Sequence, residues 1–181
     1  ELLFRDGVDN FFPAGAGGDE ATHSVIASGV SIGFEALTGG KRAFINFTAS
    51  NIHSGLAKLV PQKYLAVEIL ETVEPTGKIV AACRDLKAAG YQIVLDDFVF
   101  QPKYQPFIEL ADIIKIDFAA VSSRQQRALL RKIIPPGVRL LAEKVENDAD
   151  FCQGAELGYE FFQGYFFSRP VVIAHKEISP S

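Results

Sequence analysis

The chain has 181 residues, 48% of them hydrophobic and 22% charged, a balance typical of one folded domain with a substantial core and not of a disordered chain. The net charge of -4 disfavours a nucleic-acid polymer as partner, because such binding depends on cationic surface. No apolar run approaches the roughly 20 residues that a membrane-spanning helix needs, so we expect no membrane segment.

Strand-like and helix-like segments alternate along the chain. We expect strands at residues 2–5, 43–47, 64–70, 92–95, 113–116, 139–142 and 160–163. A glycine-rich loop is expected at 6–20, and helices at 21–37, 50–59, 76–88, 107–110, 124–134 and 148–157. Strands that alternate with helices predict an α/β fold with a parallel sheet, and about seven strands in one domain favour a barrel over an open sheet.

Polar residues stand where several of these strands end. The clearest case is the apolar run that delivers the adjacent carboxylates Asp96 and Asp97. Further strand ends carry an acidic or amide side chain, namely Asn46, Glu68, Asp117 and Glu143. Ionised carboxylates are costly to bury unless they are paired or bind a metal, so this pattern predicts a divalent cation site. Polar groups at the carboxyl ends of successive strands are also how a β/α barrel builds its active site.

Short segments distributed over residues 1–170 resemble, in their order along the chain, the signature motifs of the EAL domain of bacterial cyclic di-GMP phosphodiesterases. They are Glu1-Leu2-Leu3-Phe4-Arg5, Ile45-Asn46-Phe47-Thr48, Glu68-Ile69-Leu70-Glu71, Asp96-Asp97-Phe98, Lys115-Ile116-Asp117, Glu143-Lys144-Val145-Glu146, and residues 163–170. The spellings that contain Val99 and Lys144 are similar to the branch of the family whose EAL domain is joined to a C-terminal HDOD domain.

The resemblance implies a modified TIM-type (β/α)8 barrel. Residues 1–181 are expected to form a single barrel domain that is incomplete at its N-terminus, because the family's first strand precedes the segment that begins at Glu1. Further domains are expected outside the chain. The family's activity implies hydrolysis of cyclic di-GMP to the linear dinucleotide by two-metal activation of water.

The resemblance also implies a role for each motif residue. One Mg²⁺ or Mn²⁺ would be held by Glu1, Asn46, Glu68 and Asp96, and a second by Asp96, Asp97 and Glu143, with Ca²⁺ inhibitory. Lys115 would orient the attacking water. Arg5, Gln163, Glu146 and Asp117 are expected around the substrate, and Glu71 as an anchor of the loop that follows Asp97. Oxygen ligands of this kind suit Mg²⁺ and Mn²⁺.

Several of these residues also have structural interpretations. Asn46 and Asp97 could cap the turns that follow them, Lys115 could pair with Asp117 alone, and Glu146 could belong to the first turn of the next helix. The aromatic side chains at 161–167 are interpreted as core rather than as a platform for base stacking.

The sequence departs from the family pattern at two further points. The loop after Phe98 reads Val99-Phe100-Gln101-Pro102 and lacks the family's glycines, and Lys144 replaces a glycine beside Glu143. The altered loop favours an alternative function, a catalytically inactive module that binds cyclic di-GMP or a protein partner. An unrelated metal-dependent barrel enzyme of the aldolase or enolase type is a weaker alternative.

The remaining expectations concern oligomerisation and location. The resemblance implies a possible homodimer through the barrel. Cys83 and Cys152 stand alone with no metal-ligand spacing around them, and we interpret both as reduced residues of a cytoplasmic protein rather than as a disulfide.

Overall fold

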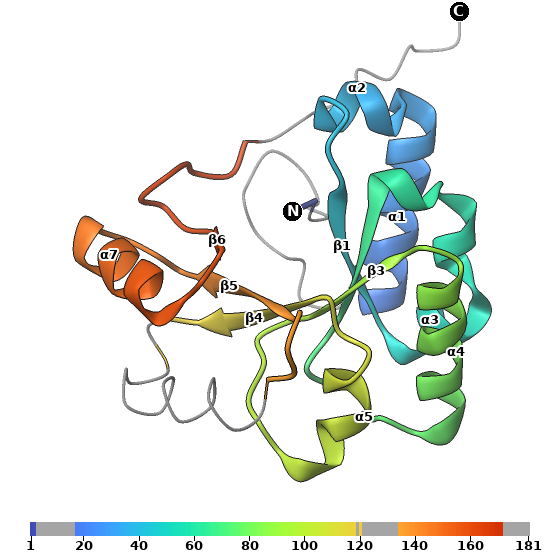
Figure 1. Cartoon of the computed structure of the whole chain (residues 1–181). Coiled ribbons are helices and arrows are strands. Elements are labelled where there is room, and N and C mark those ends of the chain that lie inside the picture. Colours follow the sequence, from blue (N-terminus) through green and yellow to red (C-terminus); the bar gives the residue numbers. More distant parts are fainter. Residues whose placement is uncertain (3–16, 119, 121–133, 172–181) are drawn as a thin grey trace, which may run out of the picture.

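A computed structural model describes residues 1–2, 17–118, 120 and 134–171. Their strands form one six-stranded sheet in the order β1-β2-β3-β4-β5-β6, and every neighbouring pair is parallel. The strands are β1 (Ala43–Phe47), β2 (Leu65–Ile69), β3 (Gln92–Leu95), β4 (Ile113–Asp117), β5 (Arg139–Glu143) and β6 (Phe161–Phe162). Strand order that follows chain order is the connectivity of a β/α barrel, and the sheet has the form of a half-barrel (Figure 1).

The two faces of the sheet carry different cores, because successive side chains of a strand point to opposite faces. One face packs into the large cluster beneath the helices with the side chains of Ile45, Phe47, Val67, Ile69, Ile93, Leu95, Ile114, Ile116, Leu140 and Ala142. The other face carries a small apolar layer made by Phe44, Ala66, Val94, Ile113, Leu141 and Phe161. The second face is the interior of the half-barrel.

Helices connect the strands and cover the outer face. They are α1 (Gly18–Ile32), α2 (Phe34–Thr38), α3 (Ala49–Ser54), α4 (Gly77–Ala88), α5 (Gln105–Ile108) and α7 (Asp148–Leu157), with short 3-10 turns at Leu56–Leu59, Gln62–Tyr64 and Pro102–Tyr104. In Figure 1, α1, α3 and α4 stand on one side of the strands and α7 lies beside β6. No helix in the described part of the chain is long and apolar enough to cross a membrane.

Side-chain caps explain where several helices begin. Thr48, Thr76 and Asn147 accept hydrogen bonds from the backbone N–H groups of Asn51, Ile79 and Asp150, at the starts of α3, α4 and α7. A cap of this type contributes about 1 kcal/mol. The starts of α3, α4 and α7 therefore agree with the expected helices to within one residue.

The helix expected at 21–37 is interrupted. It begins earlier, at Gly18, and breaks at Gly33, whose φ of 92° is in the left-handed region that glycine tolerates. The segment expected as one helix at 50–59 is likewise divided by Gly55, which has a φ of 74°. The expected helix at 124–134 lies outside the described residues except for its last residue, and the strand at 2–5 except for Leu2. The Leu2 N–H donates to the Phe44 carbonyl at 2.8 Å, so the start of the chain lies along the free edge of β1.

Candidate functional site

A layer of polar side chains lies directly above the inner apolar layer of the half-barrel. In each strand the polar residue stands two positions after the apolar one, so both face the interior. The polar layer consists of Asn46, Glu68, Asp96, Lys115, Glu143 and Gln163. The parallel register places Asn46 directly beside Glu68. The sheet therefore gathers these side chains at the carboxyl ends of its six strands, with Asp96 and Gln163 directly after β3 and β6.

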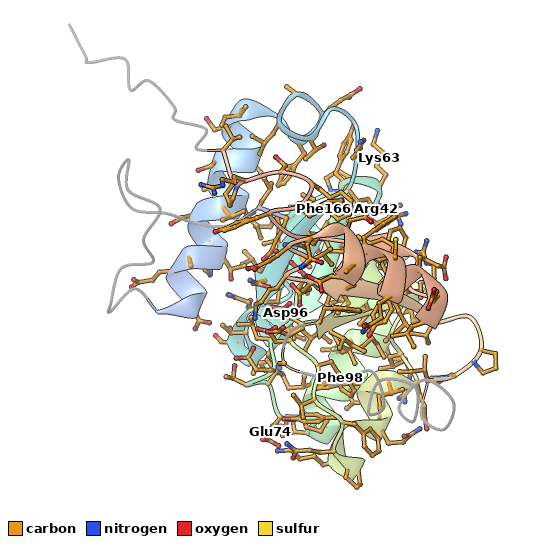
Figure 2. The ribbon with its side chains drawn as sticks, turned by 90° about the vertical axis from the view of Figure 1, so that its left-hand side faces the viewer. Arg42, Lys63, Glu74, Asp96, Phe98 and Phe166 are labelled. Carbon is orange, nitrogen blue, oxygen red and sulfur yellow. The ribbon has the colours of Figure 1, made fainter. Side chains whose placement is uncertain are left out.

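Lys115 is the centre of this layer. Its Nζ lies 2.7 Å from Asp96 Oδ1, and 2.8 Å from both Glu68 Oε1 and Glu143 Oε1. Glu1 Oε2 lies 3.6 Å away. The Lys115 side chain is 1% exposed, so an ammonium group is held inside the protein by carboxylates from neighbouring strands. Figure 2 labels Asp96 near the middle of the molecule, whereas Glu74 lies toward its edge.

Burial dominates the titration of these groups. It raises the pKa of Glu68 to about 8 and that of Glu143 to about 7, although the Lys115 ammonium acts in the opposite direction on both. Burial also raises the pKa of Asp96. For Lys115, burial lowers the pKa, but the surrounding carboxylates outweigh it and the net shift is upward. Without a further cation, these carboxyl groups therefore keep their protons to a higher pH than free carboxyl groups do.

The donor set fits a divalent cation, although the carboxylates now converge on Lys115 rather than on an empty centre. Among the described residues no three His, Cys, Asp or Glu side chains form a ready metal cluster. Buried oxygens without a hydrogen-bond partner nevertheless remain, namely Asn46 Oδ1, Glu68 Oε2 and Glu143 Oε2. Unsatisfied buried oxygens are costly, and hard oxygen donors are the ligands that Mg²⁺ and Mn²⁺ prefer. A cation would satisfy them.

A second group of charges lies at the open side of this layer. Lys144 Nζ forms an ion pair with Asp117 Oδ2 and lies 3.7 Å from Asp97 Oδ1. Asp97 and Lys144 both have left-handed backbones, with φ of 40° and 57°. Lys144 occupies the position that the family motif fills with glycine, and its φ explains why glycine suits that position. Lys115 and Asp117 do not pair with each other alone, as the structural interpretation would require, because Lys115 contacts other carboxylates.

Glu1 is held in the layer from the opposite edge of the sheet. Gln163, which follows β6, donates from Nε2 to Glu1 Oε2 at 2.6 Å. The Glu1 side chain is 13% exposed. This hydrogen bond joins the first motif of the chain, at Glu1, to the last motif, at Gln163, across the interior of the half-barrel. Arg5, the expected phosphate contact, lies outside the described residues.

Glu146 and Glu71 lie outside the layer of side chains that surrounds Lys115. Glu146 is exposed before the cap of α7, and its backbone N–H donates to Asp150. Glu71 is exposed, and its backbone carbonyl accepts a hydrogen bond from the Tyr104 hydroxyl at 3.2 Å. This contact uses the backbone of Glu71 and not its side chain, so the anchoring function of the side chain stays a prediction.

The loop without glycine packs against the segment after β2. Phe98 is buried and forms an edge-to-face contact with Tyr104, and Lys103 pairs with Glu74 at 2.7 Å. A pocket of about 300 Å³ lies between these segments, and its walls include Ile69, Val73, Leu95, Asp96, Asp97 and Phe107. Sequence reasoning did not predict this pocket, since it depends on how two loops fold together.

The aromatic segment near the C-terminal end is only partly core. Phe162 packs against the main cluster, whereas Tyr165, Phe166 and Phe167 are 59%, 40% and 50% exposed. The core interpretation is therefore wrong for these three side chains. They follow Gly164 in a turn beyond β6, where Phe166 and Phe167 contact the ring of Phe151 on α7 but keep much of their surface open to solvent.

The comparisons with known proteins agree with this architecture. A family model described as the EAL domain matches residues 27–170, and the chain therefore belongs to the EAL domain family. The cyclic di-GMP phosphodiesterase CdgJ of Vibrio cholerae is 38% identical over 99% of this chain and 42% of its own length. The uncharacterised protein YuxH of Bacillus subtilis is 39% identical over 99% of this chain and 45% of its own length. The chain thus spans less than half the length of these relatives.

Solved structures show the same fold. The Bacillus subtilis YkuI protein, with an EAL domain in complex with the substrate cyclic di-GMP and calcium, aligns with a TM-score of 0.68 at 20% identity, over 92% of this chain and 48% of that one. The EAL domain of Mycobacterium smegmatis DcpA aligns with a TM-score of 0.69 at 20% identity, over 86% of this chain and 80% of that one. The expected EAL-type α/β fold is confirmed, and a divalent metal accompanies cyclic di-GMP in the YkuI structure.

Proposed function

We propose that this EAL domain hydrolyses cyclic di-GMP to the linear dinucleotide pGpG at the polar layer of the half-barrel. The observation that carries the proposal is the convergence of Glu68, Asp96 and Glu143 on Lys115 in the interior of the sheet. Buried carboxylates at this density are disfavoured in a purely structural role. The 38% identity to a cyclic di-GMP phosphodiesterase supports the choice of substrate.

Mg²⁺ or Mn²⁺ is the proposed cofactor. Glu1, Asn46, Glu68 and Asp96 would hold one cation, and Asp96, Asp97 and Glu143 a second, with Ca²⁺ supporting binding but inhibiting turnover. When bound, such cations activate water and stabilise the charge that develops at a phosphodiester. The unpartnered oxygens of Asn46, Glu68 and Glu143 support this assignment.

The chain's own residues position the reactants. Lys115 has three ammonium protons and lies between carboxylates of adjacent strands, so it can orient a water by hydrogen bonding while it compensates their charge. Water attacks the phosphorus, one ring P–O bond breaks, and the product is linear. Gln163 holds Glu1 in place, Asp117 and Glu146 lie on the substrate side, and Arg5 is proposed as the phosphate contact.

The same proposal includes the cellular location, the neighbouring domain and the oligomeric state of the protein. We place it in the cytoplasm, which the two free thiols of Cys83 and Cys152 support. Residues 1–181 are proposed to act as one domain of a longer protein, with an HDOD domain as the expected neighbour. A homodimer through the barrel is also proposed.

A hydrolysis assay tests the function directly. Cyclic di-GMP is incubated with the protein in Mg²⁺ and in Mn²⁺, and the linear product is separated by chromatography. Glu68→Gln removes one buried carboxylate at nearly constant volume and should lower the rate by at least roughly 100-fold. Glu74→Gln is the matched control, because Glu74 is exposed and paired with Lys103 outside the polar layer. Its rate should equal that of the unmodified protein.

The binding-only alternative has its own signature. Binding of cyclic di-GMP in Ca²⁺ without product in Mg²⁺ or Mn²⁺ would contradict the phosphodiesterase proposal and make the domain a receptor. Neither binding nor product would contradict both.

A further inference from the structure

The side-chain ammonium of Lys144 lies at the edge of the proposed cation site. Its Nζ contacts the carboxylates of Asp117 and Asp97, which end two different strand segments. The carboxylate of Asp97 is one that a second cation would use under the proposed function. The Lys144 side chain is 56% exposed, so its ammonium can leave this position without crossing the core.

Stability does not account for a lysine at this position. The Lys144 and Asp97 side chains are 56% and 47% exposed, and an ion pair this open to solvent contributes little to folding. The φ of 57° at Lys144 is in a region that costs a side chain with a Cβ more than it costs glycine. Lys144 therefore has an unfavourable backbone conformation, and its ion pair with Asp97 adds little stability in return. This favours a functional role for Lys144 at the cation site.

We propose that the ammonium of Lys144, held beside Asp97 by its ion pair with Asp117, competes with the second divalent cation for Asp97, so that the domain binds one cation tightly and the other weakly. The tight position is formed by Asn46, Glu68 and Asp96, which Lys144 does not contact in any described interaction. The weak position includes Asp97. This inference rests on the proposed function, since it assigns an affinity to each of its two cations.

Competition of this kind follows from charge and geometry. A divalent cation at Asp97 would lie within a few ångströms of the ammonium, and two positive charges at such a separation repel each other. The second cation must therefore displace Lys144 from Asp97. The free energy of that displacement weakens its binding, and hydrolysis that needs both cations would depend on the cation concentration.

A titration with Mn²⁺ alone measures both affinities without any turnover. Free Mn²⁺ is followed by electron paramagnetic resonance in the unmodified protein and in Lys144→Gln, which removes the charge at similar length and leaves the backbone demand unchanged. The second cation should bind about tenfold more tightly in Lys144→Gln, whereas the tight site changes much less. Lys144→Arg keeps the charge and should retain the weak second site.

Lys87→Gln is the matched control for loss of one lysine charge. Lys87 pairs with Asp112 at the opposite end of the strands, 3.2 Å apart, and its replacement should leave both affinities unchanged. Equal second-site affinities in Lys144→Gln and the unmodified protein would overturn the inference, as would tightening in Lys144→Arg. Absence of any tight site in the unmodified protein would instead contradict the proposed function itself.

Discussion

The ammonium of Lys115 lies 2.8 Å from a carboxylate oxygen of Glu68, and the two side chains are 1% and 0% exposed. A pair this deep gains little stability unless every charge around it is compensated. The remaining oxygen of Glu68 has no hydrogen-bond partner. When Glu68, Asp96 and Glu143 are all ionised, the site has more negative charge than Lys115 compensates, and a divalent cation would balance it.

Removal of the Lys115 charge should destabilise the metal-free protein. Lys115→Met leaves Glu68, Asp96 and Glu143 without their shared cation, and breaking a buried pair of this type costs about 3–5 kcal/mol. Urea unfolding in EDTA at pH 8 measures the loss. Saturating Mn²⁺ should recover a large part of it, because the cation replaces the missing positive charge.

Lys87→Met is the control for that experiment. Lys87 and Asp112 form a pair with side chains 37% and 33% exposed, so its loss should cost no more than about 1 kcal/mol. Equal losses in the two variants would contradict the central position of Lys115.

The metal-free protein should become less stable as the pH rises. Burial raises the pKa of Glu68 to about 8 and that of Glu143 to about 7. The pKa of a glutamate carboxyl group in an unfolded chain is about 4.3. Between these values the folded state binds more protons than the unfolded state. The free energy of unfolding therefore falls as the pH rises from about 4.3 towards 8.

Chemical unfolding at pH 5, 6, 7 and 8 in EDTA checks this sign. Glu68→Gln should flatten the profile, because that side chain no longer titrates. Saturating Mn²⁺ should oppose the fall, since cation binding favours the deprotonated carboxylates. A stability that increases over this range in EDTA would show that the carboxyl groups are not buried as the structure places them.

Gly164 lies so close to the backbone of Val145 that any larger residue at position 164 should destabilise the protein. A Cβ at Gly164 would collide with the backbone oxygen and nitrogen of Val145, and overpacking of this kind costs about 1–3 kcal/mol. Because Gly164 follows Gln163, Gly164→Ala should also disturb the hydrogen bond that holds Glu1. Thermal unfolding and Mn²⁺ affinity measure the two effects.

Gly77→Ala provides the comparison, since a Cβ at Gly77 would meet open space at the start of α4. Its effect on stability should be within about 1 kcal/mol and stabilising. If Gly164→Ala were as well tolerated as Gly77→Ala, the result would contradict the packing of the turn after β6 against Val145.

The two thiols should differ in reactivity. Cys83 is buried in α4, and burial raises its pKa to about 12, whereas Cys152 is exposed. Reaction with iodoacetamide at pH 8.5, followed by mass spectrometry, should modify Cys152 alone in the native protein and both thiols in urea, because the thiolate is the reactive form. Modification of native Cys83 would contradict the packing of α4 on the sheet.

The sequence predicted the strands and the polar residues at their ends because both follow from a short-range pattern. A run such as 92–95 followed by Asp96 indicates a buried strand and its functional end within a few residues. The expected strand at 92–95 and the expected helix at 148–157 match β3 and α7 in full. The sequence does not predict the break at Gly33, since a single glycine inside a helical pattern does not show whether it ends the helix.

The arrangement of the polar side chains could not be predicted in the same way. The position of Lys115 between Glu68, Asp96 and Glu143 depends on the register of separate strands. The sequence places the cation of Lys144 beside Glu143, but the contact of Lys144 with Asp117 depends on a left-handed backbone at φ 57°. The partial exposure of Phe166 and Phe167 depends on the turn at Gly164.

The most direct test of this account is a crystal structure grown with Mn²⁺ and cyclic di-GMP, with anomalous diffraction recorded at the manganese edge. The account predicts an anomalous peak about 2.0–2.3 Å from oxygens of Asn46, Glu68 and Asp96, with Lys115 moved from its present position between the carboxylates. A map without a peak at these residues, in which Lys115 still contacts Glu68 and Asp96, would contradict it.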